Sequence, residues 1–352
     1  NGTEEVISTT ARLRAELDQV NEIAWKATTE EQLAWADEEV FPPSFEIKDG
    51  EVIQLPGEPP TSFELEKLAR FAFSMFRRAT DTELKELLEK FSRNSIVLDI
   101  SEEVPITEGW TRFGGQPNVP PDFEWPTFKG ENCESITKER PLSFLAQFDC
   151  SELSRFDSEG LLPDHGLLSF FYEVDSQRWG FDPTDKGCAR VYWFEDMNTL
   201  SPAPFPEEME DDFKFPVIGI QAQSSPSIPS YEDFLEICPE YQGKDDEEEL
   251  FDELMDELPE EQSKLLGWPD TIQNSMFAEC DLVSQGYCTG NAQSWQRIPK
   301  DFRENAEKTA RDRWTLLFQL DTVEGEDFEL MFGDCGRIYF FIQRDDLKAK
   351  RF

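Results

Sequence analysis

Two similar stretches of the sequence, around residues 147 and 319, hold the polar side chains best suited to chemistry. Aligned without a gap, they place Gln147 and Asp149 opposite Gln319 and Asp321. If both stretches fold alike, these side chains occupy symmetry-related positions and converge on a shared cleft. Paired carboxylates in such a cleft can split their pKa values and act as general acid and base, or bind a hard cation. The alternative is that each side chain satisfies backbone groups at a strand end.

Arginine and tryptophan residues form a second set of candidates, for ligand binding. A guanidinium among aromatic rings can stack on a ring and form two hydrogen bonds to a ligand carboxylate. The alternative is that each arginine pairs with an acidic residue of the protein itself. Tryptophans can line a groove for a sugar or a peptide, or anchor the core and the loops. These candidates are Arg112, Arg190, Arg337, Trp125, Trp179 and Trp268.

The cysteines and the single histidine predict neither a metal nor a cofactor. Seven cysteines are dispersed along the chain without a Cys-x-x-Cys pair, so the usual zinc spacings are missing. His165 follows Asp164 and could act as a base for Cys150. The second stretch, however, has Cys335 at the equivalent place. We therefore assign no catalytic residue and expect reduced, mostly buried cysteines.

The net charge of the chain limits its partners. It is −42 at pH 7, from 33 basic and 75 acidic side chains. Such a field repels phosphate backbones and anionic membrane surfaces, and it attracts basic proteins. The charge therefore predicts no nucleic acid partner and no membrane partner, and it favours a basic protein. Solubility in a salty environment is the alternative explanation.

Hydropathy favours a cytoplasmic protein. The sequence has no run of about eighteen apolar residues that could cross a bilayer. Its opening residues carry charges where a secretory leader would have an apolar core. We therefore expect neither a spanning helix nor a leader.

Two related sheet units must position the candidate residues. Within the first unit, Phe144, Ala146 and Phe148 alternate with side chains of the opposite face. A turn precedes each aligned strand, and a glycine with an aromatic strand follows it. The matching segments are 115–118 with 267–270, and 166–171 with 336–341. This shared order predicts an ancestral duplication.

The predicted fold class is α+β, with mainly antiparallel sheets in duplicated half-domains and a helical N-terminal segment. Residues 1–105 form that segment: apolar stripes at helical spacing lie in 13–24, 65–76 and 84–91, the last two behind capping boxes. Asp49-Gly50 predicts a hairpin near 45–53. The duplicated domain spans 106–352, with a first copy at about 110–200, an acidic insert at about 205–261 and a second copy at about 262–352. An apolar stripe in 245–261 predicts an acidic amphipathic helix.

Short motifs extend over the same duplicated region. They are Phe113–Asn118 with Trp125-Pro126, Pro141–Gln147, Gly166–Phe171, Trp179–Asp182, Gly187–Asp196, Leu265–Asp270 with Gln273, Glu279-Cys280, Trp314–Asp321 and Met331–Phe340. In order and spacing they resemble the YwqG-like family, a mainly bacterial group of unknown function. Each motif is weak alone, and the combination is specific. The resemblance implies a duplicated α+β domain and brings no ligand or catalytic residue. Some members occur near toxin and immunity genes, which implies a binding or neutralising role.

Two functions follow from these observations. The first is an acidic binding protein without enzymatic activity that docks or neutralises a basic protein such as a toxin. The alternative is a hydrolase-like enzyme that uses carboxylates near Asp149 and Asp321, in a cleft between the two copies. We favour binding over catalysis.

Overall fold

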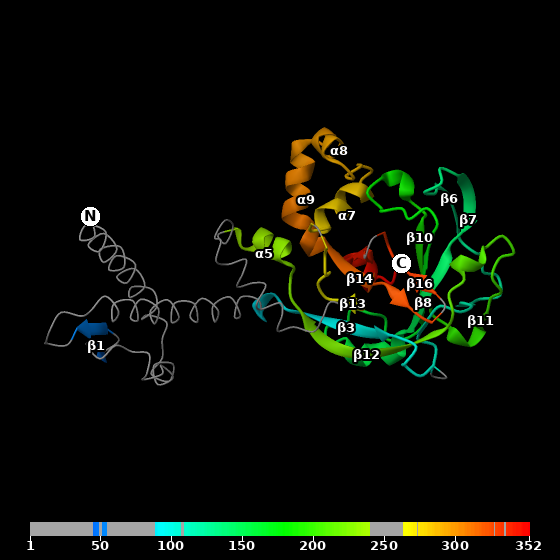
Figure 1. Ribbon diagram of the computed structural model, residues 1–352, viewed down its shortest axis with the longest axis horizontal. Helices are drawn as coiled ribbons and strands as arrows, with labels where there is room; N and C mark the ends of the chain where they lie inside the picture. The colour runs from blue at the N-terminus through cyan, green and yellow to red at the C-terminus, as the bar shows by residue number, and fades with distance from the viewer. Residues whose placement is uncertain are drawn as a thin grey trace, which may run out of the picture. The chain divides into compact units, whose positions relative to one another are not determined.

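Figure 1 shows the computed structural model, which describes residues 45–48, 51–54, 89–106, 109–239, 263–272, 274–326, 328–333 and 336–352. Contacts divide the chain into two compact units, Asn1–Lys90 with Glu249–Met255 and Phe91–Glu248 with Asp256–Phe352. In the first unit, β1 (Phe45–Lys48) pairs antiparallel with β2 (Glu51–Gln54), where the Asp-Gly pair predicted a hairpin. The helices predicted in 13–24, 65–76 and 245–261, and most of the one in 84–91, lie outside the described residues.

One sheet of nine strands organises the described part of the second unit, and all its neighbouring strands pair antiparallel. The strand order is β10-β9-β8-β4-β12-β3-β13-β14-β17. In this order the strands span Ala189–Phe194, Leu167–Tyr172, Ser143–Asp149, Arg112–Phe113, Ile218–Ser227, Arg93–Ile100, Lys264–Leu266, Trp314–Leu320 and Ile338–Gln343. With the helices beside it, the sheet confirms the predicted α+β class.

The sheet begins upstream of the domain start predicted at residue 106. Strand β3 lies between β12 and β13 and pairs with both. Its apolar residues Ile96, Val97 and Leu98 are all buried, which explains why this segment joins the sheet.

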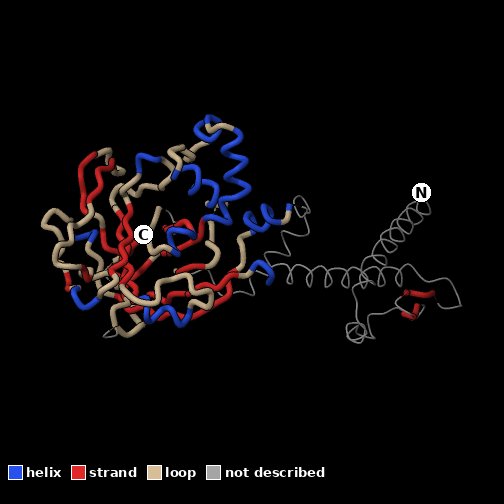
Figure 2. Tube along the Cα trace, turned by 180° about the vertical axis from the view of Figure 1, so that it is seen from behind, coloured by secondary structure: helices blue, strands red, loops and turns tan. Residues whose placement is uncertain are grey.

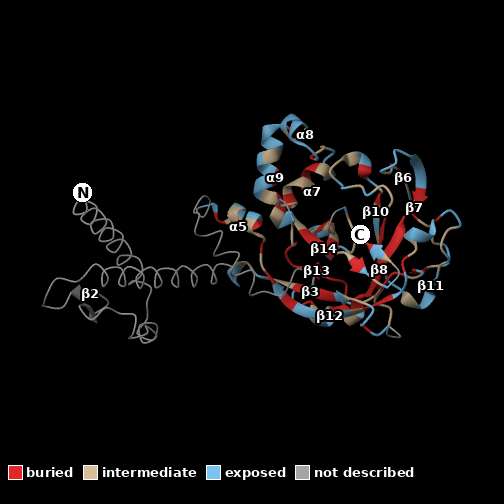
Figure 3. Cartoon of the chain, in the orientation of Figure 1, coloured by how far each residue is buried: buried red, intermediate tan, exposed pale blue. Residues whose placement is uncertain are grey.

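The sheet curls, so that strands far apart in its order face each other across one core. The rings of Phe148 on β8 and Phe318 on β14 lie 5.2 Å apart. Phe170 on β9 lies 4.7 Å from Phe318 and 5.2 Å from Phe340 on β17. Figure 3 shows the buried stretches of these strands in the interior of the unit. Aromatic side chains of β4, β8, β9, β14 and β17 therefore supply much of the main apolar core, and aliphatic side chains of β3, β12 and β13 complete it.

We call β10, β9, β8 and β4 the first half of the sheet and β13, β14 and β17 the second half. Helices cover the outer face of the second half. Trp268, Phe277 and Phe341 pack there with α7 (Phe277–Ser284) and α9 (Lys300–Arg313). These helices gather at one end of the unit together with α8 (Ala292–Arg297) (Figure 2). On the first half, a second aromatic cluster forms the outer layer instead: Phe123, Trp125, Phe144, Phe171 and Tyr192.

The two halves repeat the same strand register. The ladder between β8 and β9 shifts between Phe144 and Ala146, and the ladder between β14 and β17 shifts between Leu316 and Phe318. These positions are equivalent in the sequence alignment. The neighbouring strand also keeps its register, because β4 pairs Arg112 with Gln147 and β13 pairs Lys264 with Gln319.

Smaller elements complete the described part of the chain. They are the hairpin β6 (Thr127–Glu131) and β7 (Thr137–Pro141), the pairs β5 (Asn118–Val119) with β11 (Ser201–Pro202) and β15 (Val323–Glu324) with β16 (Glu329–Leu330), and the helices α4 (Cys150–Leu153), α5 (Tyr231–Ile237) and α10 (Arg344–Lys348). Among the described residues, no helix has the length and apolar character needed to cross a membrane.

Candidate functional site

A cavity of about 320 Å³ lies where the two edge strands of the sheet contribute to one wall. The first half lines it with Tyr172, residues 177–181 and Cys188-Ala189, and the second half with Thr271-Ile272, Asn274, Met276, Glu279, Phe332-Gly333 and residues 336–340. Because both halves contribute side chains, this cavity is the concave site that joins them. We call it the edge cavity.

The walls of the edge cavity are largely apolar and aromatic. Tyr172 and Phe332 contact each other from opposite halves, with their rings 6.1 Å apart. Trp179 stacks on Phe181 at 6.2 Å and is 71% exposed, and Ile272 is 54% exposed. Large apolar side chains exposed beside a cavity are a feature of binding sites.

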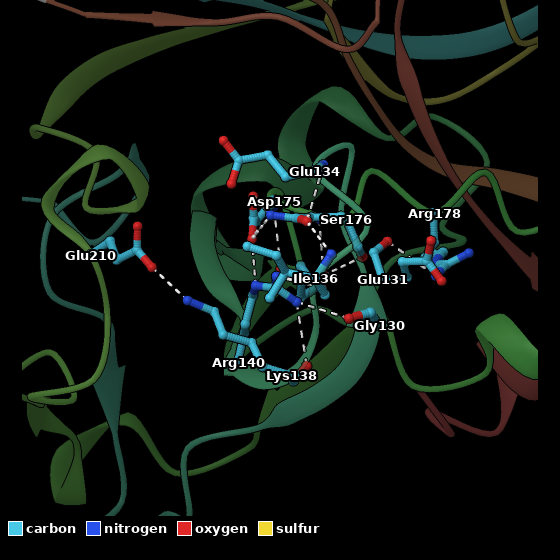
Figure 4. A network of polar contacts seen from close by, with 12 residues as sticks. Gly130, Glu131, Glu134, Ile136, Lys138, Arg140, Asp175, Ser176, Arg178 and Glu210 are labelled. Carbon is cyan, nitrogen blue, oxygen red and sulfur yellow. Dashed lines mark hydrogen bonds and ion pairs between the residues drawn. The ribbon is translucent and has the colours of Figure 1, made fainter.

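A buried arginine holds the loop that carries Trp179. Arg140 on β7 is buried and forms an ion pair with Asp175. Its guanidinium also donates to the backbone oxygens of Gly130 at 2.9 Å and Ile136 at 3.1 Å. Figure 4 shows this network between the β6–β7 hairpin and the loop. Burial of a paired charge makes the loop conformation costly to change.

Arg178 continues the same loop into the edge cavity. Its Nη2 donates to the Glu131 oxygen at 3.1 Å, and its Nε lies 3.8 Å from the carboxylate of Asp185. The Tyr172 hydroxyl donates to the Arg178 oxygen at 2.8 Å. Burial raises the pKa of Tyr172, so its phenol is neutral. The first half therefore presents a neutral phenol and a guanidinium that has an acidic partner.

The second half presents a matching set of polar groups. Arg337 donates from Nε to Asp321 Oδ2 at 2.7 Å and from Nη1 to the Asp270 oxygen at 3.2 Å. The Tyr339 hydroxyl donates to that same oxygen at 2.7 Å. Each half thus gives the cavity one arginine beside a carboxylate and one tyrosine whose hydroxyl donates to a backbone oxygen.

Glu279 differs from the other ionisable groups of the wall. It lies in the first turn of α7, and burial raises the pKa of its carboxyl to about 7. Among the described residues, no hydrogen bond or ion pair to this carboxyl is found. A half-buried carboxyl without a partner is a common feature of functional sites.

Gln147 and Gln319 lie elsewhere and have the same role in their two halves. Both are fully buried, and each Oε1 accepts a backbone N–H from the preceding turn, from Asn118 at 3.0 Å and from Asp270 at 2.9 Å. Each Nε2 donates to the side chain of that same residue, at 3.0 Å and 2.8 Å. Gln147 also donates to the Trp110 oxygen at 2.8 Å. We call each of these arrangements a glutamine lock.

The two glutamines do not converge. Phe148 and Phe318 point into the core, and successive residues of a strand point to opposite faces of the sheet. Gln147 and Gln319 therefore face outward, each toward its own turn. Two separate locks replace the shared cleft predicted around these residues.

The two aspartates also have separate roles. Asp149 is the N-cap of α4, and its carboxylate accepts the backbone N–H of Ser151 at 2.9 Å. Asp321 pairs with Arg337 and accepts the N–H of Thr322 at 2.7 Å. One carboxylate caps a helix and the other pairs with an arginine, so each is engaged in a contact of its own half.

The remaining arginine candidates stabilise backbone. Arg112 donates to the oxygens of Trp110 and Gln116, and burial lowers its pKa. Arg190 is exposed and donates to the Ala189 oxygen at 3.2 Å. Neither lines the edge cavity.

Two of the tryptophan candidates are structural. Trp125 donates to the Leu142 oxygen at 2.9 Å in the outer aromatic cluster. Trp268 is 2% exposed and donates to the Phe91 oxygen at 2.7 Å, and the Arg93 guanidinium lies 3.5 Å above its ring. Of the ten residues proposed from the sequence, Trp179 and Arg337 line the edge cavity.

Sequence reasoning missed Arg178, Glu279, Tyr172 and Tyr339 as residues of this site. Three signals for it were present, because Trp179–Asp182, Glu279-Cys280 and Met331–Phe340 are among the short motifs. Nothing in the linear sequence brings these motifs together, since they lie on different halves and meet only through the curl of the sheet.

By its fold the chain is an α+β protein with one curled antiparallel sheet, and residues from both edges of that sheet line a cavity. The chain belongs to the family described as a domain of unknown function (DUF1963), whose model matches residues 111–352. No curated protein matches the chain.

Proposed function

We propose that this is a binding protein that docks a basic partner protein and takes one of its apolar side chains into the edge cavity. The edge cavity is the observation that supports this most. Aromatic and aliphatic side chains at a concave site are typical anchors of protein interfaces. Trp179 and Ile272, both more than half exposed, extend this apolar surface around the opening.

The charge of the chain selects the class of partner. A net charge of −42 accelerates encounter with a basic protein and disfavours acidic ones. Arg178 and Arg337 do not reverse this, because Asp185 and Asp321 lie beside them. An apolar residue flanked by basic residues therefore fits the site best.

Catalysis by a carboxylate pair has less support. Asp149 and Asp321 are engaged in a helix cap and an ion pair, and they belong to separate structural roles. A general acid and base need two groups within reach of one substrate. The binding function needs no such pair and uses the cavity as it stands.

Three further statements belong to the same proposal. The matching registers and locks support an origin of the two halves by duplication. The motif set supports a place among YwqG-like domains. The free cysteines at 133, 150, 188, 238, 280 and 288 support function in the reducing cytoplasm.

Phage-displayed peptides panned against the full chain test the binding function. We expect enrichment of sequences with one apolar or aromatic residue flanked by Lys or Arg, and weaker binding as salt rises. The variant Trp179→Ala/Ile272→Asp should lose at least tenfold of this binding, because both side chains are exposed at the opening.

The control is Ile106→Asp, which changes an apolar side chain that is 63% exposed and does not line the edge cavity. It should bind like the wild type. Enrichment of acidic peptides, or equal binding by all three proteins, would refute the proposal.

A further inference from the structure

A second, larger cleft of about 800 Å³ shares a wall with the edge cavity. Phe181, Asn274 and Glu279 line both. The backbone N–H of Thr289, in the wall of the cleft, donates to the Phe181 oxygen at 2.9 Å and ties the two sites together. The two hollows are therefore adjacent compartments with a common wall.

The charge of the cleft is negative. Glutamates from three helices line it: Glu232 and Glu236 from α5, Glu279 from α7 and Glu307 from α9. The described residues of the lining include no lysine or arginine. Arg311, outside the lining, pairs with Glu236 and leaves the other three carboxyl groups without a described cationic partner.

The carboxyl groups also act on one another. Burial raises the pKa of Glu236, and the negative charges of Asp233 and Glu307 add to that increase while Arg311 opposes it. Like charges held this close favour a proton or an external cation. The electrostatic field in the cleft is thus only partly compensated by the protein.

The side chain of Thr289 is an observation independent of the carboxylates. Thr289 is 6% exposed and lies in the wall of the cleft, and its Oγ1 has no hydrogen-bond partner among the described residues. Buried hydroxyl groups are normally paired, and an unpaired one costs about 1–3 kcal/mol. An ammonium or guanidinium group in the cleft would supply the missing donor.

We infer that the cleft takes a cationic side chain, lysine or arginine, of the same partner segment whose apolar side chain enters the edge cavity. This inference rests on the proposed binding function and specifies its partner as an apolar residue beside a cationic one. Glu279 lies between the two compartments and contacts both. The apolar compartment gives affinity, and the acidic compartment gives selectivity for charge.

A small cation tests the cleft without the edge cavity. We would add n-butylammonium to the ¹⁵N-labelled full chain and follow the backbone amides of Thr289 and Asn291 by NMR, with n-butanol as the neutral probe of the same length. Saturable shifts are expected with the cation alone. Glu279→Gln and Glu307→Gln should each weaken the binding about threefold to fivefold, the size of one exposed charge pair.

Glu304→Gln is the matched control, because Glu304 is on α9 and pairs with Lys300 away from the cleft. It should bind like the wild type, and melting temperatures should show that all variants fold. Equal shifts with n-butanol, or no shifts with either probe, would overturn the inference. The variant Trp179→Ala/Ile272→Asp should keep the cation shifts, so failure of the apolar anchor and failure of the cleft are distinguishable.

Discussion

In the first half of the sheet Gln147 holds the turn at Asn118, and in the second half Gln319 holds the turn at Asp270 through the same pair of contacts. The hydroxyl groups beside the locks match as well. Thr111 Oγ1 accepts the N–H of Asp149, and Ser263 Oγ accepts that of Asp321, both at 3.0 Å. The two halves of the sheet are therefore stabilised by equal contacts at equal registers.

The surroundings of the two locks differ in charge. In the second half, Lys264 is 4% exposed and its Nζ lies 2.5 Å from Asp270 Oδ1. In the first half, the equivalent Arg112 donates to backbone oxygens and to no carboxylate among the described residues, and Asn118 is neutral. The Asp270 oxygen also accepts from Arg337 and Tyr339 of the edge cavity. The second lock is therefore charged and connected to the proposed binding site.

We expect the largest effect on stability from removing the buried charge of the second lock. Lys264→Met leaves the Asp270 carboxylate without its ammonium partner and should lower the free energy of unfolding by about 3 kcal/mol or more. Arg112→Met removes contacts to two carbonyl groups and should cost about 1–2 kcal/mol. Urea unfolding of both variants measures the contrast. Equal losses would show that the charge of the second lock is immaterial.

Removal of the glutamines tests the similarity of the locks. Gln147→Ala and Gln319→Ala each leave a buried backbone N–H without an acceptor and should each cost about 2–3 kcal/mol. The exposed Gln221 on β12 is the control, and Gln221→Ala should change stability by less than about 0.5 kcal/mol. Thermal and urea unfolding measure both losses of free energy of unfolding. Losses that differ by more than about 1 kcal/mol would show that the two locks are not equivalent.

The locks also show how far the sequence predicts this molecule. Alternation, turn glycines and the aligned Gln and Asp residues predicted the strands and the α+β class, because these features are local. Gly115 and Gly267 have φ of 73° and 75°, a conformation that glycine adopts without strain, so the matched turns were visible in the sequence. The direction of Gln147 and Gln319 was not visible, since it depends on which face of the strand the curl encloses.

The edge cavity was less predictable than the fold. Trp179 and Arg337 were candidates because of their residue types, but so were eight residues that have structural roles. Arg178 and Glu279 were missed because an arginine or glutamate in a chain with 75 acidic side chains carries little local signal. Both residues line one cavity because β9 and β17 face each other, and these strands are far apart in the sequence.

The free energy of unfolding measured against pH tests the protonation of Glu279, which the second half contributes to the cavity wall. Burial raises the pKa of Glu279 from its ordinary value of 4.5 to about 7 in the folded protein. Between these values the folded state binds more protons than the unfolded state, so this group makes stability fall as pH rises. The penalty is absent below about pH 4.5 and complete above about pH 7.

Glu279→Gln should therefore raise the free energy of unfolding at pH 8 and leave it nearly unchanged at pH 4. Solvent screening of a half-buried carboxyl limits the gain to about 1 kcal/mol. Glu304→Gln, exposed on α9, should show no such pH-dependent gain. A Glu279→Gln variant that is destabilised at pH 8 would mean that the carboxylate has a favourable partner in the folded protein.

The smallest expected effect concerns the hydroxyl groups beside the locks. Thr111→Val and Ser263→Ala each remove one acceptor from a backbone N–H, and each should cost about 1 kcal/mol. Thr111 Oγ1 also donates to Glu152 Oε2 at 2.8 Å, a contact that the described residues do not repeat at Ser263. The Thr111 variant should lose slightly more, and Glu152→Gln should remove part of that excess because a charged acceptor strengthens the bond. Unfolding of the three single variants and of Thr111→Val/Glu152→Gln separates the shared backbone contact from the contact specific to the first half. If Ser263→Ala instead loses more free energy of unfolding than Thr111→Val, the Ser263 hydroxyl also stabilises the charged lock of the second half.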